Sequence, residues 1–172
     1  MSSDNQSLVR QARSGSAEAF GELYAGIAAE LYRFAVYQTS NPTLAEDAVS
    51  ECVLQAFQNI AQLKNAARFR SWMFSILLNC CRKQQKEKAL ALHRVPADDC
   101  DVVAPQTLPT DEALDLRAAL QTLDEAEREI LLLSAVGGYS SKEIGTMLSM
   151  RAGAVRTRLS RTRAKLMEAI SK

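Results

Sequence analysis

A strongly basic segment near the C-terminus has the residue types that bind nucleic acid. Six lysines and arginines stand between Arg151 and Lys165, and this stretch contains no aspartate or glutamate. An ordinary solvent-exposed helix face carries charges of both signs, so the missing carboxylates favour a phosphate-rich partner. A solvated basic helix that closes a small bundle is the weaker alternative.

The residues around this segment predict two helices joined by a tight turn. Ser140 and Glu143 form a capping box that starts the first helix, and Ile144 begins its apolar face. Val155 and Leu159 give the basic second helix an inward stripe. A short helix, a turn and a longer cationic helix are typical of a helix-turn-helix, whose second helix enters the DNA major groove.

A second group of cationic, amide and aromatic side chains lies in the first half of the chain. The stretch from Lys64 to Lys88 holds seven basic residues against Glu87 alone. Such a mixture can hold a nucleic-acid backbone and capture an unpaired base. We interpret Phe69 and Trp72 mainly as core residues and assign strand binding to the loop and nearby polar residues: Lys64, Asn65, Arg68, Arg70, Asn79 and Arg82.

Helical periodicity runs through both halves of the chain. It predicts a helix over Ser16 to Gln38, a second opened by a capping box at Thr43 to Glu46, and a third from about Phe69 to Ala89. Helical order returns at Thr110, and Gly137 with Gly138 ends a later helix. No strand pattern is present, so the predicted fold class is all-α.

Residues 95–109 separate the two halves. This stretch has three prolines, three aspartates and no usable periodicity, which is typical of a flexible linker. We therefore predict two small helical domains, over residues 1–94 and 110–172, of which the second contains the helix-turn-helix. Hydrophobic residues make up 47% of the 172 residues, which is enough for packed cores.

Composition excludes several other classes of protein. No apolar run approaches the ~20 residues needed to span a bilayer, and the polar N-terminus lacks the features of a signal peptide, so we expect a cytoplasmic protein with no membrane insertion. The cysteines and the lone His93 lack the spacing of a zinc site, so reduced structural thiols are favoured over metal binding. We expect no cofactor and no catalytic residues, because no acid, base and nucleophile set is visible.

Over nearly its whole length the chain resembles the extracytoplasmic-function group of bacterial sigma-70 RNA polymerase sigma factors. In the first half the resemblance rests on Leu31 to Ala35, Asn41-Pro42, Ala45 to Val49 with Glu51, and Phe69 to Ile76 with Asn79. In the second half it rests on Glu127 to Ile130, Ser140 with Glu143-Ile144, and Gly153 to Leu159 with Arg161, Arg163 and Leu166. Leu123-Asp124 departs from the Leu-Pro that is usual in the family.

The resemblance implies a division of labour between the two domains. The first would bind core RNA polymerase and the single-stranded minus-10 element, and the second would bind the minus-35 duplex. In the second domain Arg156, Thr157 and Ser160 would face base edges, whereas Arg151, Arg158 and Arg161 would hold phosphates. The residues expected to dock to the polymerase form an acidic and apolar patch: Glu46, Asp47, Val49, Glu51 and Val53.

Several alternatives remain open at this stage. Glu46 and Asp47 could simply stabilise a helix N-terminus. Residues 95–109 could mimic nucleic acid in the polymerase RNA path or act as a bare spacer. Alternative functions are a sigma-like decoy that binds an anti-sigma protein, and a helix-turn-helix repressor or activator, which would leave the first domain unexplained. Two basic faces on one chain also predict a protein inhibitor, an anti-sigma factor.

Overall fold

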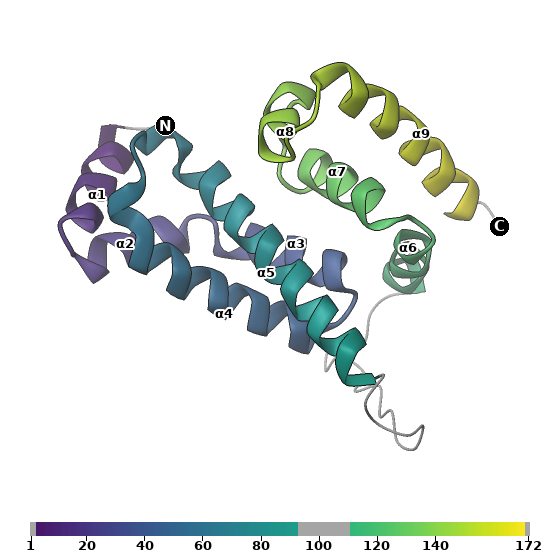
Figure 1. The fold of residues 1–172 in the computed structure, drawn as a ribbon, viewed down its shortest axis with the longest axis horizontal. Coiled ribbons are helices and arrows are strands. Elements are labelled where there is room, and N and C mark those ends of the chain that lie inside the picture. The colour runs from purple at the N-terminus through teal and green to yellow at the C-terminus, as the bar shows by residue number, and fades with distance from the viewer. Residues whose placement is uncertain (1–2, 93–110, 171–172) are drawn as a thin grey trace.

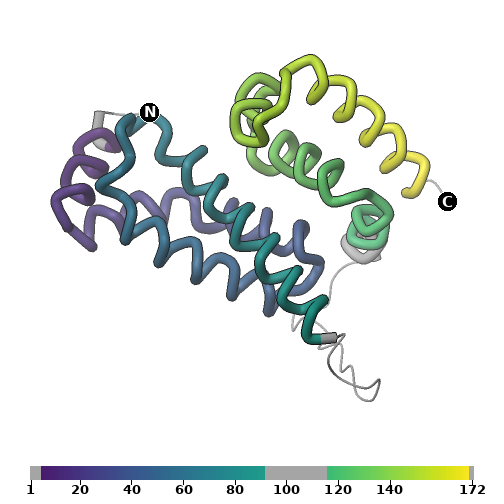
Figure 2. The backbone as a smooth tube through the Cα atoms, in the orientation of Figure 1, coloured from purple at the N-terminus to yellow at the C-terminus, as the bar shows by residue number. Residues whose placement is uncertain are grey.

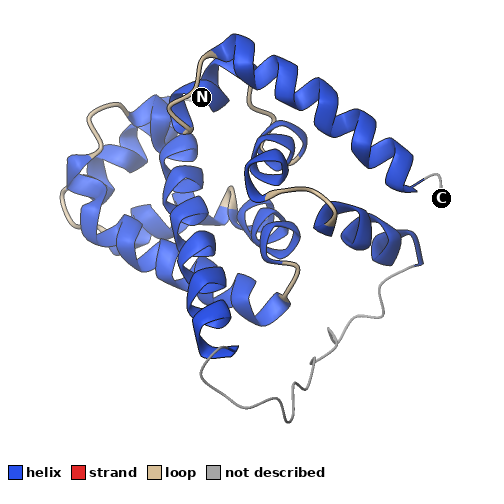
Figure 3. Ribbon diagram, turned by 45° about the vertical axis from the view of Figure 1, so that its right-hand side comes forward, coloured by secondary structure: helices blue, strands red, loops and turns tan. Residues whose placement is uncertain are grey.

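The computed structural model describes residues 3–92 and 111–170, and within these ranges the chain is helical (Figure 1). These ranges contain helices, turns and loops but no strand (Figure 3), which confirms the all-α prediction. No helix in them is long and apolar enough to cross a membrane. The predicted linker, 95–109, lies outside the described residues, as do His93 and Cys100.

The first helical group contains five α-helices and two short 3-10 turns. These are α1 (Ser3–Arg13), α2 (Ala17–Ala25), α3 (Ala28–Thr39), α4 (Pro42–Asn59), η1 (Ile60–Gln62), η2 (Ala66–Arg68) and α5 (Phe69–Leu92). The long helices α4 and α5 lie side by side, and α3 packs against both (Figure 2). Phe34 and Phe74 meet edge to face inside this group, with ring centroids 5.5 Å apart, and both are fully buried.

Two local predictions for this group were wrong. The helix expected over Ser16 to Gln38 is broken at Gly26 and Ile27, where the amides of both residues bond back to α2 and end it. Glycine is a poor helix former, which the apolar periodicity alone conceals. The N-cap of α4 is Asn41, not Thr43: the Asn41 Oδ1 accepts from the Leu44 amide at 3.1 Å, and Pro42 takes the first helical position.

The second helical group consists of α6 (Asp111–Gln121), α7 (Glu125–Ala135), α8 (Ser141–Met147) and α9 (Ala152–Ile170). The capping box of Ser140 and Glu143 opens α8 as predicted, and the apolar stripe of α9 is buried as predicted. A second capping box, formed by Asp124 and Glu127, opens α7. The aspartate that replaces the family's proline therefore starts this helix by a side-chain cap.

The two helical groups pack against each other, which the sequence did not predict. Helix α7 contacts α3, and the Tyr139 ring meets the Phe74 ring of α5 with centroids 5.5 Å apart. The buried apolar residues of both groups form one continuous cluster. We call this contact, between α3 and α5 on one side and α7 with Gly137 to Tyr139 on the other, the seam.

Candidate nucleic-acid and polymerase interface

Helix α9 buries one face and presents the other to solvent. Val155, Leu159 and Thr162, spaced at three and four residues, are buried against α7 and α8. All six residues predicted to contact the minus-35 duplex are exposed, five on α9 and one immediately before it: Arg151, Arg156, Thr157, Arg158, Ser160 and Arg161. The predicted base readers and phosphate contacts therefore share one accessible surface.

The basic residues of α9 divide into two sets by their partners. Lys165 forms an ion pair with Glu127, and Arg163 donates a hydrogen bond to the Ser134 hydroxyl at 3.3 Å, so both tie α9 to α7. No acidic side chain in the described part of the chain pairs with the four arginines among the six predicted DNA contacts. Their charge is thus available to a polyanion.

The turn between α8 and α9 depends on two special backbone positions. Ser149 adopts a left-handed conformation with φ of 56°, which redirects the chain after α8. The Gly145 carbonyl accepts a hydrogen bond from the Met150 amide at 2.7 Å. A Cβ atom at Gly145 would stand 2.5 Å from the Met150 carbonyl oxygen, so only glycine fits this close approach.

The loop before α5 carries three of the residues predicted to bind the minus-10 strand. Lys64, Asn65 and Arg68 are exposed, and the Asn65 Oδ1 caps η2 by accepting from the Ala67 amide at 3.0 Å. Phe69 is buried and meets Phe20 edge to face, in agreement with its interpretation as a core residue. The Asn65 cap therefore holds the turn, and the Lys64 and Arg68 side chains remain accessible to solvent.

Arg70, another predicted strand contact, is held in the seam. Its Nε and Nη2 donate to the Glu30 Oε2 at 3.0 and 2.6 Å, and its Nη1 donates to the Gly137 carbonyl at 2.7 Å. The guanidinium also lies over the Phe74 and Tyr139 rings, 5.1 and 4.9 Å from their centroids. Burial raises the pKa of Tyr139 to about 12 despite this cation.

Arg82 is held in the seam in the same way. It makes a two-pronged ion pair with Glu129, with Nε–Oε1 and Nη2–Oε2 distances of 2.6 Å, and only 3% of the Glu129 side chain is exposed. The hydrogen bonds to Glu129 raise the pKa of Arg82. In this arrangement Arg70 and Arg82 bind protein groups, whereas Asn79 remains exposed on α5.

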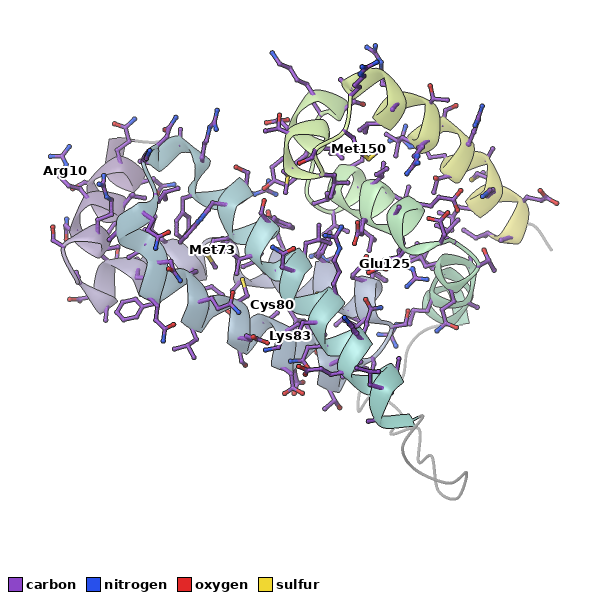
Figure 4. All side chains as sticks on the ribbon, in the orientation of Figure 1. Arg10, Met73, Cys80, Lys83, Glu125 and Met150 are labelled. Carbon is purple, nitrogen blue, oxygen red and sulfur yellow. The ribbon has the colours of Figure 1, made fainter. Side chains whose placement is uncertain are left out.

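The polymerase-docking patch predicted on α4 is smaller than expected. Glu46 and Asp47 are exposed, and Val53 is half-buried. Val49 is only 8% exposed and packs into the core, so it offers little surface to a docking partner in this arrangement. Glu51 pairs with Lys83 of α5 at 2.6 Å, and this hydrogen bond lowers the pKa of Glu51, so its charge is already partnered (Figure 4 labels Lys83).

Two apolar residues of α4 that the sequence analysis missed are exposed. Leu54 has an exposed fraction of 57% and Phe57 of 36%, although the other face of the helix is buried. Leu54 and Phe57 stand three residues apart and outside the buried stripe that includes Cys52 and Ala56, and the Phe57 ring also meets the Phe20 ring edge to face, with centroids 5.3 Å apart. The accessible patch on α4 is therefore Glu46, Asp47, Val53, Leu54 and Phe57.

The described cysteines are free and buried. Cys52, Cys80 and Cys81 are inside the first helical group, and the Cys52 thiol donates to the Met73 carbonyl at 3.5 Å. Burial raises the pKa of Cys80 to about 11 and that of Cys81 to about 12, so both stay protonated at neutral pH. Residues 3–92 and 111–170 contain no cluster of three or more metal-ligating side chains.

Comparison with known proteins assigns both helical groups. The family model described as Sigma-70 region 2 matches residues 23–89, and the model described as Sigma-70, region 4 matches residues 113–166. The RNA polymerase sigma factor CarQ of Myxococcus xanthus is 30% identical over 160 residues, covering 91% of each chain. The ECF RNA polymerase sigma factor EcfG of Rhodopseudomonas palustris is 29% identical over 143 residues, covering 79% of this chain and 76% of EcfG.

A solved structure shares the arrangement of both groups. CnrH of Cupriavidus metallidurans, solved in complex with the cytosolic domain of CnrY, matches with a TM-score of 0.72 at 28% identity, covering 98% of this chain and 97% of CnrH. The matched regions and the exposed basic helix define a promoter-binding transcription factor with two helical parts. The chain belongs to the extracytoplasmic-function group of the sigma-70 family, and it is an alternative sigma factor that directs promoter recognition by RNA polymerase.

Proposed function

We propose that three accessible surfaces have separate roles in transcription initiation. The patch on α4 would bind core polymerase, the loop before α5 would bind the minus-10 strand, and α9 would bind the minus-35 duplex. The observation that carries this proposal is the exposed face of α9 with Arg151 immediately before it, where six exposed polar residues include four arginines without an acidic partner in the described chain. A purely structural surface helix would pair such charges, as Lys165 is paired with Glu127 on the same helix.

Position on α9 separates the readers from the phosphate contacts. Arg156 and Ser160 are one turn apart on the same side, and Thr157 lies beside them with its hydroxyl bonded back to the Gly153 carbonyl at 3.1 Å. These three would contact base edges in the major groove of the minus-35 duplex. Arg158 and Arg161, with Arg151 before the helix, would hold the flanking phosphates.

The minus-10 strand would be held by Lys64, Asn65, Arg68 and Asn79. Arg82 would join this surface only when the seam opens and separates it from Glu129. Arg70 would in addition have to leave Glu30 of α3, which lies on its own side of the seam. Capture of one or two unpaired bases by these cationic and amide groups would favour melting without nucleotide hydrolysis. The protein would therefore act without an enzymatic activity of its own.

Core polymerase would bind the α4 patch. Two carboxylates beside exposed Leu54 and Phe57 suit a partner helix with cationic and apolar residues. Asp47→Lys should weaken binding to core polymerase, most strongly at low salt, while the second helical group keeps its affinity for duplex DNA. Glu18→Lys, an equal charge reversal at an exposed position of α2, serves as the matched control and should bind polymerase normally.

The same patch would be the target of an anti-sigma factor in the cytoplasm. CnrH was solved with the cytosolic domain of CnrY, and an inhibitor that covers α4 would exclude polymerase by competition. The proposed division is residues 1–94, a linker of 95–109, and residues 110–172, and the two matched regions, 23–89 and 113–166, support it.

Transcription with purified core polymerase and a genomic promoter library tests the proposal. The wild-type chain should start transcripts at a defined promoter set, and Arg156→Ala should lose or change that set. If the chain binds core polymerase but starts no transcript from any promoter, the assignment of α9 and the loop to promoter recognition fails.

A further inference from the structure

The N-terminal helix α1 lies outside both matched family regions, yet it is firmly attached to the loop before α5. Val9 and Ala12 on its inner face are buried, and α1 contacts both η1 and η2. Its outer residues Arg10 and Arg13 are exposed, and Figure 4 shows Arg10 at the end of the molecule opposite α9. The helix therefore brings two cations to the loop that carries Lys64 and Asn65.

A hollow of about 480 Å³ lies where α1 meets this loop. Its described lining contains three cations, two amide side chains and no acid: Gln6, Val9, Arg10, Arg13, Lys64, Asn65 and Ala66. None of the three cations pairs with a carboxylate in the described part of the chain. The hollow is thus lined by positive charge and hydrogen-bond donors.

Helix stability explains only part of this arrangement. Arg10 and Arg13 stand in the last turn of α1, where cations favourably oppose the helix dipole. Lys64 belongs to another element, and placing a third cation beside them costs electrostatic energy unless an anion is present. The hollow therefore has the chemistry of a phosphate-binding site.

We propose that α1 and the loop before α5 together bind the phosphodiester backbone of the single-stranded promoter DNA next to the bases held by the loop. This inference rests on the proposed function of Lys64 and Asn65 in strand capture and adds Arg10 and Arg13 as strand-binding residues. The backbone is the ligand because the hollow is continuous with the loop and its cations act on charge, not on base identity.

Binding of a short fluorescein-labelled oligothymidylate to the full-length protein, measured by anisotropy across a salt series, tests this site. Each phosphate contact to a single strand contributes about 0.7 to the slope of log affinity against log salt. The double variant Arg10→Ala/Arg13→Ala should lower that slope by about 1.4, and Lys64→Ala by about 0.7. Arg33→Ala, an exposed arginine of α3 that does not line the hollow, should leave the slope unchanged.

The charge-conserving variant Arg10→Lys/Arg13→Lys should retain the slope, and its thermal unfolding shows whether α1 stays packed. An unchanged slope in the folded double alanine variant overturns the proposal, even if Lys64→Ala weakens binding as the proposed function requires. Equal losses for labelled duplex and single strand also overturn it, because they would mark a general electrostatic surface. If Lys64→Ala has no effect either, strand capture by the loop fails as well.

Discussion

The ion pair of Arg82 with Glu129 should control whether the seam is closed. Arg82→Met keeps most of the apolar stem and removes the guanidinium, so the Glu129 carboxylate, 3% exposed, would be left buried without its cation. Separation of the two helical groups would return that carboxylate to water. The variant should therefore favour the open arrangement.

The size of this effect lies between two limits. Breaking a fully buried pair costs about 3 to 5 kcal/mol, and an exposed pair contributes about 0.2 to 1 kcal/mol. Because 43% of the Arg82 side chain is exposed, water screens the pair, and we take about 2 kcal/mol. The open-to-closed ratio should then rise roughly 30-fold.

The seam also contains a buried polar group that opposes its closure. The side-chain amide of Gln38 is fully buried there, and neither its Nε2 nor its Oε1 has a hydrogen-bond partner in the described residues, although the backbone carbonyl of Gln38 accepts from Arg128 and Gln85. An unpaired buried polar group costs about 1 to 3 kcal/mol, and opening relieves that cost. A shift of 2 kcal/mol should therefore be visible as a change of population.

Single-molecule energy transfer measures that population. Dyes at Ser50→Cys on α4 and Ala164→Cys on α9, both exposed positions, report the separation in a Cys100→Ser background. Arg82→Met should enlarge the low-transfer population. Lys83→Met, which breaks the Lys83–Glu51 pair inside the first helical group, is the matched control and should not. Identical distributions for the two variants and the parent would refute the role assigned to the Arg82–Glu129 pair.

Three further predictions concern the helix-turn-helix and the buried thiols. Ser140→Ala should destabilise the second helical group by about 1 kcal/mol in denaturant titrations, because it removes the α8 cap. Hydrogen bonds from Ser140 also lower the pKa of Glu143, so the part of this effect that comes from the carboxylate is complete above the ordinary value of 4.5 and disappears as the pH falls through the lower folded-state pKa, while the part from the Glu143 amide bond to the Ser140 hydroxyl remains; a difference that does not shrink at all in acid would contradict the carboxylate's role. Arg156→Ala should relax selectivity at one base pair of the minus-35 duplex, at a cost of about 1 to 3 kcal/mol, whereas Arg161→Ala should weaken all sequences alike and lower the salt slope by about 1; equal effects of both on every sequence would refute the division. Cys80 and Cys81 should react with a disulfide reagent at neutral pH only after unfolding, since burial raises both pKa values; rapid reaction of the native protein would show that they are accessible.

Local chemistry made the second helical group predictable. The cap of α8 and the stripe of α9 depend on residues three and four positions apart, and the sequence shows such spacings directly. Helix α1 was not predicted because Leu8, Val9 and Ala12 are its only apolar residues among polar neighbours. Three positions so close together do not establish a helical period.

The seam could not be predicted for a different physical reason. Arg82 and Glu129 are 47 residues apart in the sequence. Arg82 lies in a mainly basic stretch and Glu129 in a mainly acidic one, and such stretches are normally predicted to be exposed to solvent. A single sequence does not indicate which basic residue becomes buried in an ion pair or which acidic residue is its partner. The same limit applies to Val49 and Glu51, because periodicity identifies a helix face but not the neighbour that covers it.

The missing side chain at Gly145 has a consequence for how promoter preference can change. Helix α9 spans 19 residues, about 28 Å, and a Cβ at Gly145 would stand 2.5 Å from the Met150 carbonyl oxygen in the turn before it and 3.5 Å from the Ala152 nitrogen at its start. Any larger residue at position 145 would tilt α9 at its N-terminal end and displace all its exposed side chains together. Single substitutions on the exposed face of α9 could therefore change the proposed promoter contacts one at a time. Glycine at position 145 would meanwhile keep the angle between α9 and the DNA major groove unchanged.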